Sequence, residues 1–86
     1  MSAVLRAEAD SLDWVRVRSS NVEAAAYSPT FGRMFVRYKG GKTYAYDGVP
    51  RGVYEGLLAA PSKGQYVYYV LRAKGTDSVY SVIGPI

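Results

Sequence analysis

Two alternating runs joined by a pair of glycines decide the fold of this chain: Arg33-Met-Phe-Val-Arg-Tyr38, Lys39-Gly-Gly41 and Lys42-Thr-Tyr-Ala-Tyr46. The alternating runs are rich in the β-branched and aromatic residues that suit a pleated, half-buried surface. The glycines reach the positive φ angles that tight hairpin turns require. We therefore predict a β-hairpin over residues 33–46, followed by a helix from Pro50, whose ring presets φ for a first helical turn.

One register of this hairpin builds a recognition face. If the two glycines alone form the turn, Arg37 lies opposite Tyr44, and Phe35 lies opposite Tyr46. Both tyrosines then share a face of the sheet with arginine. In this register the sheet presents stacking rings and cations together on the side that its helices leave bare.

The other register builds a core instead. A three-residue turn that includes Lys39 sets Tyr44 beside Val36 and Tyr46 beside Met34. The tyrosine rings then pack as part of the buried interior. The sequence alone favours neither register.

Two further strands are predicted before the hairpin. The side chains of residues 14–18 alternate as in a strand with one solvent-exposed face. The two valines lie on one side, and Trp14, Arg16 and Arg18 lie on the other. Residues 22–27 lie between turn signals and are also predicted as a strand. The residues before Trp14 show a weak helical pattern without a convincing cap, and we predict that they form a loosely docked arm.

Two helices and a terminal strand are predicted after the hairpin. Apolar residues at helical spacing predict helices over residues 51–60 and 64–72. Ser62 and Gln65 have the spacing of a capping box, which would start the second helix. Residues 79–83, Val-Tyr-Ser-Val-Ile, predict a short strand that pairs either within the sheet or with a neighbouring chain.

Together these elements predict an α+β fold. An antiparallel sheet of three to five strands, a β-meander, is expected to pack against two C-terminal helices. The expected organisation is an N-terminal arm over residues 1–12, a domain over 13–74 and a C-terminal tail over 75–86. A length of 86 residues allows one modest hydrophobic core and no second domain.

The composition argues against metal binding, catalysis and membrane insertion. The chain has no cysteine and no histidine, and its seven acidic residues are scattered singly. The usual transition-metal ligands, general bases and nucleophiles are therefore missing, and we predict a non-enzymatic protein without a metal or cofactor. No apolar run approaches the roughly 18 residues of a membrane span, and no signal-peptide pattern is present, so we expect a cytoplasmic protein.

An ordered set of residues carries a resemblance to a known family. The set consists of Trp14, Val17, Ser19-Ser20-Asn21, Tyr27, Tyr38, Gly41, Tyr44-Ala-Tyr46, Val49-Pro50, Val53-Tyr54, Ala60, Ser62, Gly64 and Leu71. Over residues 13–74 the chain resembles the KTSC domain, named for the C-terminal extension of some lysyl-tRNA synthetases and also found as small free-standing proteins of bacteria and phages. The resemblance implies a small α+β domain without catalytic residues, for which RNA binding has been proposed.

Protein–protein interaction is the first functional hypothesis. Nine tyrosines in 86 residues exceed what so small a core needs, and tyrosine and arginine are enriched at binding hot spots. We expect Tyr68, Tyr69 and Arg72 of the second helix to contribute to a binding surface, and the strand at 79–83 to offer a contact for a homo-oligomer. For a phage-type protein, the expected partner is a host or defence protein.

Binding of RNA or another single-stranded nucleic acid is the second hypothesis. In the register with the two-residue turn, one face carries the aromatic and basic side chains of Arg16, Arg18, Phe35, Arg37, Tyr44 and Tyr46. Stacking of a base on an aromatic ring contributes about 1–3 kcal/mol, and basic contacts to phosphates add salt-dependent affinity. A third hypothesis is the sequestration of a small anionic nucleotide between subunits.

Overall fold

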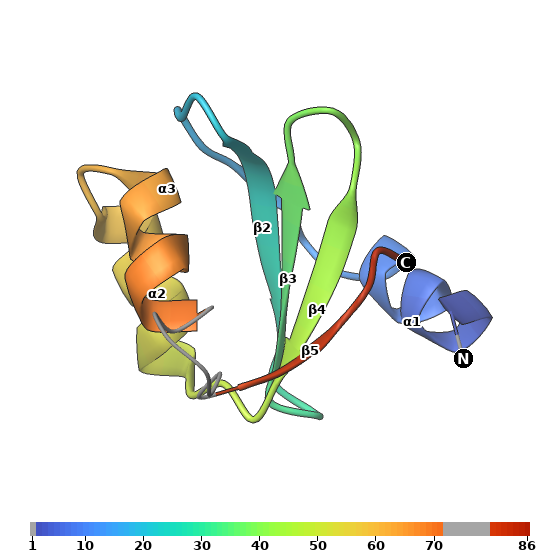
Figure 1. Ribbon diagram of the computed structural model, residues 1–86. Helices are drawn as coiled ribbons and strands as arrows, with labels where there is room; N and C mark the ends of the chain where they lie inside the picture. The colour runs from blue at the N-terminus through green and yellow to red at the C-terminus, as the bar shows by residue number, and fades with distance from the viewer. Residues whose placement is uncertain (1, 72–79) are drawn as a thin grey trace.

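An antiparallel sheet of five strands, in the order β1-β2-β3-β4-β5, forms the centre of the molecule (Figure 1). This computed structural model describes residues 2–71 and 80–86. The strands are β1 (Val15–Arg16), β2 (Val22–Ser28), β3 (Arg33–Tyr38), β4 (Thr43–Asp47) and β5 (Ser81–Ile83). Since neighbouring strands in the sheet are also consecutive in the chain, the predicted β-meander and α+β class are confirmed.

Helices cover both faces of this sheet. They are α1 (Ser2–Asp10), α2 (Arg51–Ala59) and α3 (Lys63–Tyr66), with a π-helical continuation of α3 called η1 (Val67–Leu71). Figure 1 shows α2 and α3 on one side of the strands and α1 on the other. The two predicted C-terminal helices are therefore present, and a third, N-terminal helix takes the face that was expected to stay bare.

A three-residue turn closes the hairpin of β3 and β4. The backbone N–H of Tyr38 donates to the carbonyl oxygen of Lys42 at 2.8 Å, and the N–H of Gly41 donates to the carbonyl oxygen of Tyr38 at 3.0 Å. Gly40 and Gly41 have φ angles of 102° and 99°, a region that residues with a side chain rarely adopt. Lys39 therefore belongs to the turn rather than to the strand.

This turn sends the tyrosines of β4 toward α2 and α3. Val36 pairs with Tyr44, and Met34 pairs with Tyr46. The Tyr46 side chain is buried at 1% exposure, and Tyr44 is half-buried. The register with a two-residue turn, which placed both rings on the arginine-bearing face, is therefore wrong.

The larger core lies between the sheet and the C-terminal helices. Its buried members are Val22, Ala25, Met34, Val36, Tyr46, Val49, Tyr54, Leu57, Val67 and Leu71. The first C-terminal helix ends one residue earlier than predicted. The second is confirmed as helical up to Leu71, but its last turn is the wider π form, and the predicted end at Arg72 lies outside the described residues.

The smaller core explains why the N-terminal arm is ordered. Leu5 and Ala9, one helical turn apart on α1, are both buried against Phe35 of β3 and Ala45 of β4. Arg33 extends this contact by pairing with Glu8 of α1 and with Asp47 of β4. The expectation of a loosely docked arm is wrong, because a short helix without caps can be stabilised by tertiary packing alone.

The two edge strands are short. The predicted strand over residues 14–18 is reduced to Val15–Arg16, although Val17 still donates to the carbonyl oxygen of Glu23 at 3.1 Å. The predicted terminal strand is present over Ser81–Ile83 and pairs with β4 inside the sheet. The beginning of the predicted strand, at Val79, lies outside the described residues.

Helices α2 and α3 approach each other closely at Gly56. A Cβ built at this position would lie 2.2 Å from the hydroxyl oxygen of Tyr66. That hydroxyl donates to the carbonyl oxygen of Val53 at 2.9 Å, and burial raises the pKa of Tyr66, so the group stays a donor. Glycine at position 56 therefore leaves the space in which the Tyr66 hydroxyl of α3 hydrogen-bonds to the backbone of α2.

Gly56→Ala should destabilise the protein, whereas Gly52→Ala on the same helix should not. The methyl group at 56 displaces the Tyr66 hydroxyl from Val53, at a cost of about 2 kcal/mol that outweighs a gain in helix propensity of about 1 kcal/mol. A Cβ at Gly52 meets no atom within 4 Å, so that variant should gain about 0.5–1 kcal/mol. Urea titrations give both free energies of unfolding. Equal effects of the two substitutions would contradict the described helix contact.

Candidate functional site

The side chains predicted to share one recognition face are divided between the two faces of the sheet. Phe35 is fully buried beneath α1, whereas Tyr46 is buried beneath the C-terminal helices. The division follows from the register, because alternate residues of a strand point to opposite faces. The single aromatic and cationic platform expected for nucleic acid is therefore not formed.

The arginines of that predicted platform have different surroundings. Arg37 is half-buried, with its guanidinium carbon 4.3 Å from the centroid of the Trp14 ring and its Nε donating to the Thr43 hydroxyl at 3.3 Å. Arg37 thus holds the chain between α1 and β1 against the sheet. Arg16 and Arg18 are exposed near the β1 edge of the sheet. Strands β2 and β3 separate this edge from the tyrosines of β4.

Two tyrosines of the second C-terminal helix are exposed, as the sequence predicted for this aromatic-rich segment. Tyr68 is 47% exposed and Tyr69 is 58% exposed, because Val67 and Leu71 take the positions that face the core. The two rings contact each other edge to face, with centroids 5.0 Å apart. They form an exposed aromatic pair. Arg72, predicted to accompany them, lies outside the described residues.

A hollow of about 370 Å³ lies beside these tyrosines, and we call it the polar hollow. It is built from two segments far apart in the sequence. Its lining residues are Ser19, Ser20, Asn21, Ser62, Lys63, Gly64, Gln65, Tyr68 and Tyr69. Hydroxyl and amide groups dominate this lining, so the polar hollow presents neutral hydrogen-bond donors and acceptors next to two exposed rings.

Local hydrogen bonds shape the first wall of the polar hollow. The Ser19 hydroxyl oxygen accepts from the backbone N–H groups of Asn21 and Val22, both at 3.1 Å. The carbonyl oxygen of Asn21 accepts from the N–H of Lys39 at 2.8 Å. This wall is therefore tied to both β2 and the hairpin turn.

The second wall is the start of α3. The Ser62 hydroxyl accepts from the backbone N–H of Gln65 at 3.3 Å, which is the half of the predicted capping box that the structure contains. A Cβ at Gly64 would lie 3.0 Å from the side-chain nitrogen of Asn21. Glycine at 64 therefore lets the two walls meet closely.

Lys63 lines the polar hollow but has a structural role. Its ammonium group donates to the carbonyl oxygens of Leu58 at 2.9 Å and Ala60 at 2.5 Å, where α2 ends. A cation at the C-terminal end of a helix satisfies carbonyl groups that have no partner within the helix. The ammonium group of Lys63 is therefore already engaged in hydrogen bonds that stabilise the end of α2.

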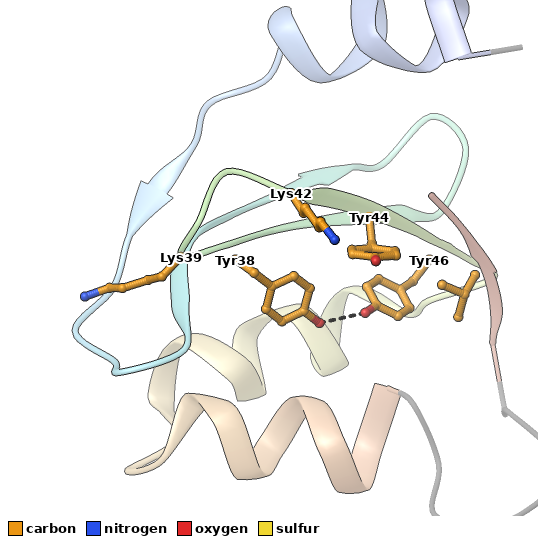
Figure 2. A pocket seen from close by; sticks show the side chains of 6 residues that line it. Tyr38, Lys39, Lys42, Tyr44 and Tyr46 are labelled. Carbon is orange, nitrogen blue, oxygen red and sulfur yellow. Dashed lines mark hydrogen bonds between the residues drawn. The ribbon is translucent and has the colours of Figure 1, made fainter. Parts of the chain in front are cut away.

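A second hollow, of about 300 Å³, lies at the turn end of the hairpin, and we call it the tyrosine–lysine hollow (Figure 2). Its lining residues are Tyr38, Lys39, Lys42, Tyr44, Tyr46 and Val82. The hydroxyl groups of Tyr38 and Tyr46 are 2.7 Å apart and hydrogen-bonded. The Tyr44 ring meets the Tyr38 ring edge to face, with centroids 5.7 Å apart.

Neither hollow offers a metal site. Within residues 2–71 and 80–86, the side chains of His, Cys, Asp and Glu form no group of three or more that could hold a metal ion. Glu8 and Asp47 are paired with Arg33, and Glu55 is paired with Arg51. In the same part of the chain, no helix is both long enough and apolar enough to cross a membrane.

Most of the polar hollow is not predictable from the sequence. The surplus of aromatic surface indicates Tyr68 and Tyr69, but residues 19–21 have the pattern of a turn and Ser62 that of a helix cap. The available signal was that both segments belong to the ordered set of residues that carries the family resemblance. Only the fold brings those two segments together.

A family model and a solved structure both indicate one family for this chain. A sequence model of the KTSC domain matches residues 18–74, which contain both walls of the polar hollow. A protein from Tsukamurella paurometabola is 41% identical over 58 residues, covering 67% of this chain and 87% of that protein. The crystal structure of a KTSC domain protein from Yersinia pestis matches with a TM-score of 0.71 and 26% identity, over 86% of this chain and 100% of that chain.

Lys63→Met should lower the free energy of unfolding by about 1–2 kcal/mol, because the last carbonyl groups of α2 lose two charge-assisted hydrogen bonds. The matched control is Lys42→Met, which removes an equal charge from an exposed side chain and should change stability by less than about 0.5 kcal/mol. Thermal and urea unfolding measure both variants. A Lys63→Met protein as stable as the control would show that the cap contributes nothing.

Proposed function

This chain belongs to the KTSC domain family, and we propose that it is a non-enzymatic binding module whose polar hollow, together with Tyr68 and Tyr69, docks a segment of a partner protein. The observation that carries this proposal is the pair of rings, 47% and 58% exposed, beside a concave polar surface. The walls of that surface come from the part of the chain that the family model matches.

The exposed rings supply the apolar part of such an interface. Tyrosine offers a large, amphipathic contact area while ordering only two side-chain torsions, which is why it is enriched at hot spots. The edge-to-face contact between Tyr68 and Tyr69 restricts both rings before any partner arrives. Less conformational entropy is then lost on binding.

The hollow itself favours a peptide over a polyanion. Ser19, Ser20, Asn21 and Gln65 contribute neutral groups that can pair with the N–H and C=O groups of an extended peptide. The cation in the lining, Lys63, is already bonded to the end of α2. We therefore propose a cytoplasmic bacterial protein as the partner, belonging to the host if the chain is of phage origin.

Self-association through β5 is an alternative of the same class. β5 is an edge strand of three residues, and its Val82 side chain is 45% exposed. An edge strand can pair with the same strand of a second copy. Light scattering over a hundredfold range of protein concentration separates the two: a constant monomer mass rules out self-association and leaves the polar hollow as the candidate surface.

Peptides selected from a random display library against the intact protein should bind at the polar hollow. Replacing both rings, as Tyr68→Ala with Tyr69→Ala, should weaken the selected peptides by about five- to thirtyfold, corresponding to about 1–2 kcal/mol for hot-spot residues. The matched control is Phe31→Ala, since Phe31 is 62% exposed but lies in the β2–β3 turn. Fluorescence anisotropy gives the affinities.

Backbone amide NMR shifts of the peptide complex locate the contact independently. Perturbations at Ser20, Asn21 and Gln65 support the proposal. If the selected peptides lose affinity with Phe31→Ala rather than with the double tyrosine variant, or if the library yields no binder, the polar hollow is not a docking surface.

A further inference from the structure

The tyrosine–lysine hollow has a chemistry different from that of the polar hollow. We propose that it binds a nucleotide, with one base against the tyrosine rings and the attached phosphate at Lys42. The ligand chemistry is an aromatic base carrying a phosphate, supplied either by a free nucleotide or by one unit of a single strand. This inference is independent of the proposed protein-binding surface, because the two hollows share no lining residue.

The rings of this hollow are held in place before a ligand arrives. Tyr46 is 1% exposed and anchors the hydroxyl of Tyr38 through their 2.7 Å hydrogen bond. Tyr38 and Tyr44, both half-buried, line the hollow in an edge-to-face contact. Aromatic side chains fixed in this way provide a surface on which any base can stack.

The end of the chain fixes the position of Tyr44. A Cβ at Gly84 would lie 2.7 Å from Cδ2 of the Tyr44 ring and 3.1 Å from the carbonyl oxygen of Thr43. Just beyond, the N–H of Ile86 donates to that same carbonyl oxygen at 2.9 Å. Backbone rather than a flexible side chain therefore packs against the Tyr44 ring, and glycine is what permits this approach.

The charge around the hollow favours an anion. Of the four basic residues between positions 33 and 42, Arg33 and Arg37 make their contacts on the α1 side of the sheet, whereas Lys39 and Lys42 line the hollow. Lys39 and Lys42 are exposed, and neither forms an ion pair with a carboxylate of the described residues. Figure 2 shows the Lys42 side chain reaching toward the tyrosine rings, while Lys39 extends away from them. Lys42 is therefore placed for a phosphate attached to a stacked base, and Lys39 for a neighbouring phosphate.

The hollow has room for one nucleotide, either free or as one unit of a strand. A volume of about 300 Å³ is at the lower end of the range of about 300–1,000 Å³ for small-molecule sites. An acidic peptide would satisfy the lysines but would leave the rings without a stacking partner. The combination of rings and cations therefore favours a nucleotide.

The test uses adenosine monophosphate and a uridine hexanucleotide as probes, titrated into the intact protein and followed by amide NMR shifts. Lys42→Glu should weaken both probes, and Tyr44→Leu should weaken them by about 5- to 150-fold, the effect of losing one base stack. The matched controls are Arg16→Glu, with the same change in charge at the β1 edge, and Tyr69→Leu, with the same loss of a ring at the polar hollow. Both controls should stay within about twofold of the parent protein.

Lys39→Glu identifies the source of the nucleotide. If it weakens the hexanucleotide but not the monophosphate, the site accepts a strand whose next phosphate lies at Lys39. If the monophosphate binds as tightly as the hexanucleotide and ignores Lys39→Glu, the ligand is a free nucleotide. For the strand, the slope of log K against log salt should be about −1.4 for two phosphate contacts and should shrink by about 0.7 in Lys42→Glu.

Three outcomes overturn the inference: no shift with either probe, equal weakening by Arg16→Glu and Lys42→Glu, or binding of a glutamate hexapeptide as tight as that of the hexanucleotide. Circular dichroism controls for folding of the Tyr44→Leu protein. Should that variant unfold, the Lys42→Glu variant still tests the inference. The Lys42 side chain is exposed and forms no ion pair with a described residue, and the substitution leaves the backbone hydrogen bond from Tyr38 to Lys42 in place.

Discussion

The length of one turn governs the arrangement of this molecule. The hydrogen bond between Tyr38 and Lys42 makes the hairpin turn three residues long, and side-chain alternation then assigns every residue of β3 and β4 to a face. Phe35 and Tyr46 are both buried, but on opposite faces. Since burying one such side chain contributes about 1.5–3 kcal/mol, a shift of one residue would cost several times that amount across the sheet.

Because helices cover both faces of the sheet, no bare face remains for recognition. α1 fills one side through Leu5 and Ala9, and the C-terminal helices fill the other. The two candidate hollows lie at the start of α3 beside the β1–β2 loop, and toward the turn end of the hairpin beside β5. The first of these hollows is lined by loop and helix-start residues, whereas strand residues supply the rings of the second.

Elements with strong local signals could be predicted from the sequence. The glycine pair of the hairpin, Pro50 before α2 and Ser62 before α3 each satisfy a local backbone requirement, and the corresponding elements are present. The helix α1 has no such signal. Its order depends on contacts with Phe35 and Ala45, which are distant in the sequence. The hairpin register depends in the same way on which residues the helices bury.

The candidate sites were less predictable than the fold. The exposure of Tyr68 and Tyr69 was predictable, because helical spacing alone shows which neighbouring apolar residues face the core and leave these rings outside. The polar hollow was not foreseen, since its two walls meet only after the sheet and α3 have packed together. The role of Lys63 in capping the end of α2 was not predictable either. Its partners are backbone carbonyl groups, which every residue has, so the sequence does not show which of them a lysine will reach.

The most direct test of this account is the cross-strand NOE from the Hα of Ala45. With the three-residue turn, Ala45 faces Phe35 as a non-hydrogen-bonded pair, with Cα atoms about 4.5 Å apart, so a strong Hα–Hα cross-peak between these two residues is predicted. A strong cross-peak from Ala45 to the Hα of Val36 instead would establish the two-residue turn. That result would return Tyr44 and Tyr46 to the face with Arg37 and contradict the arrangement described above.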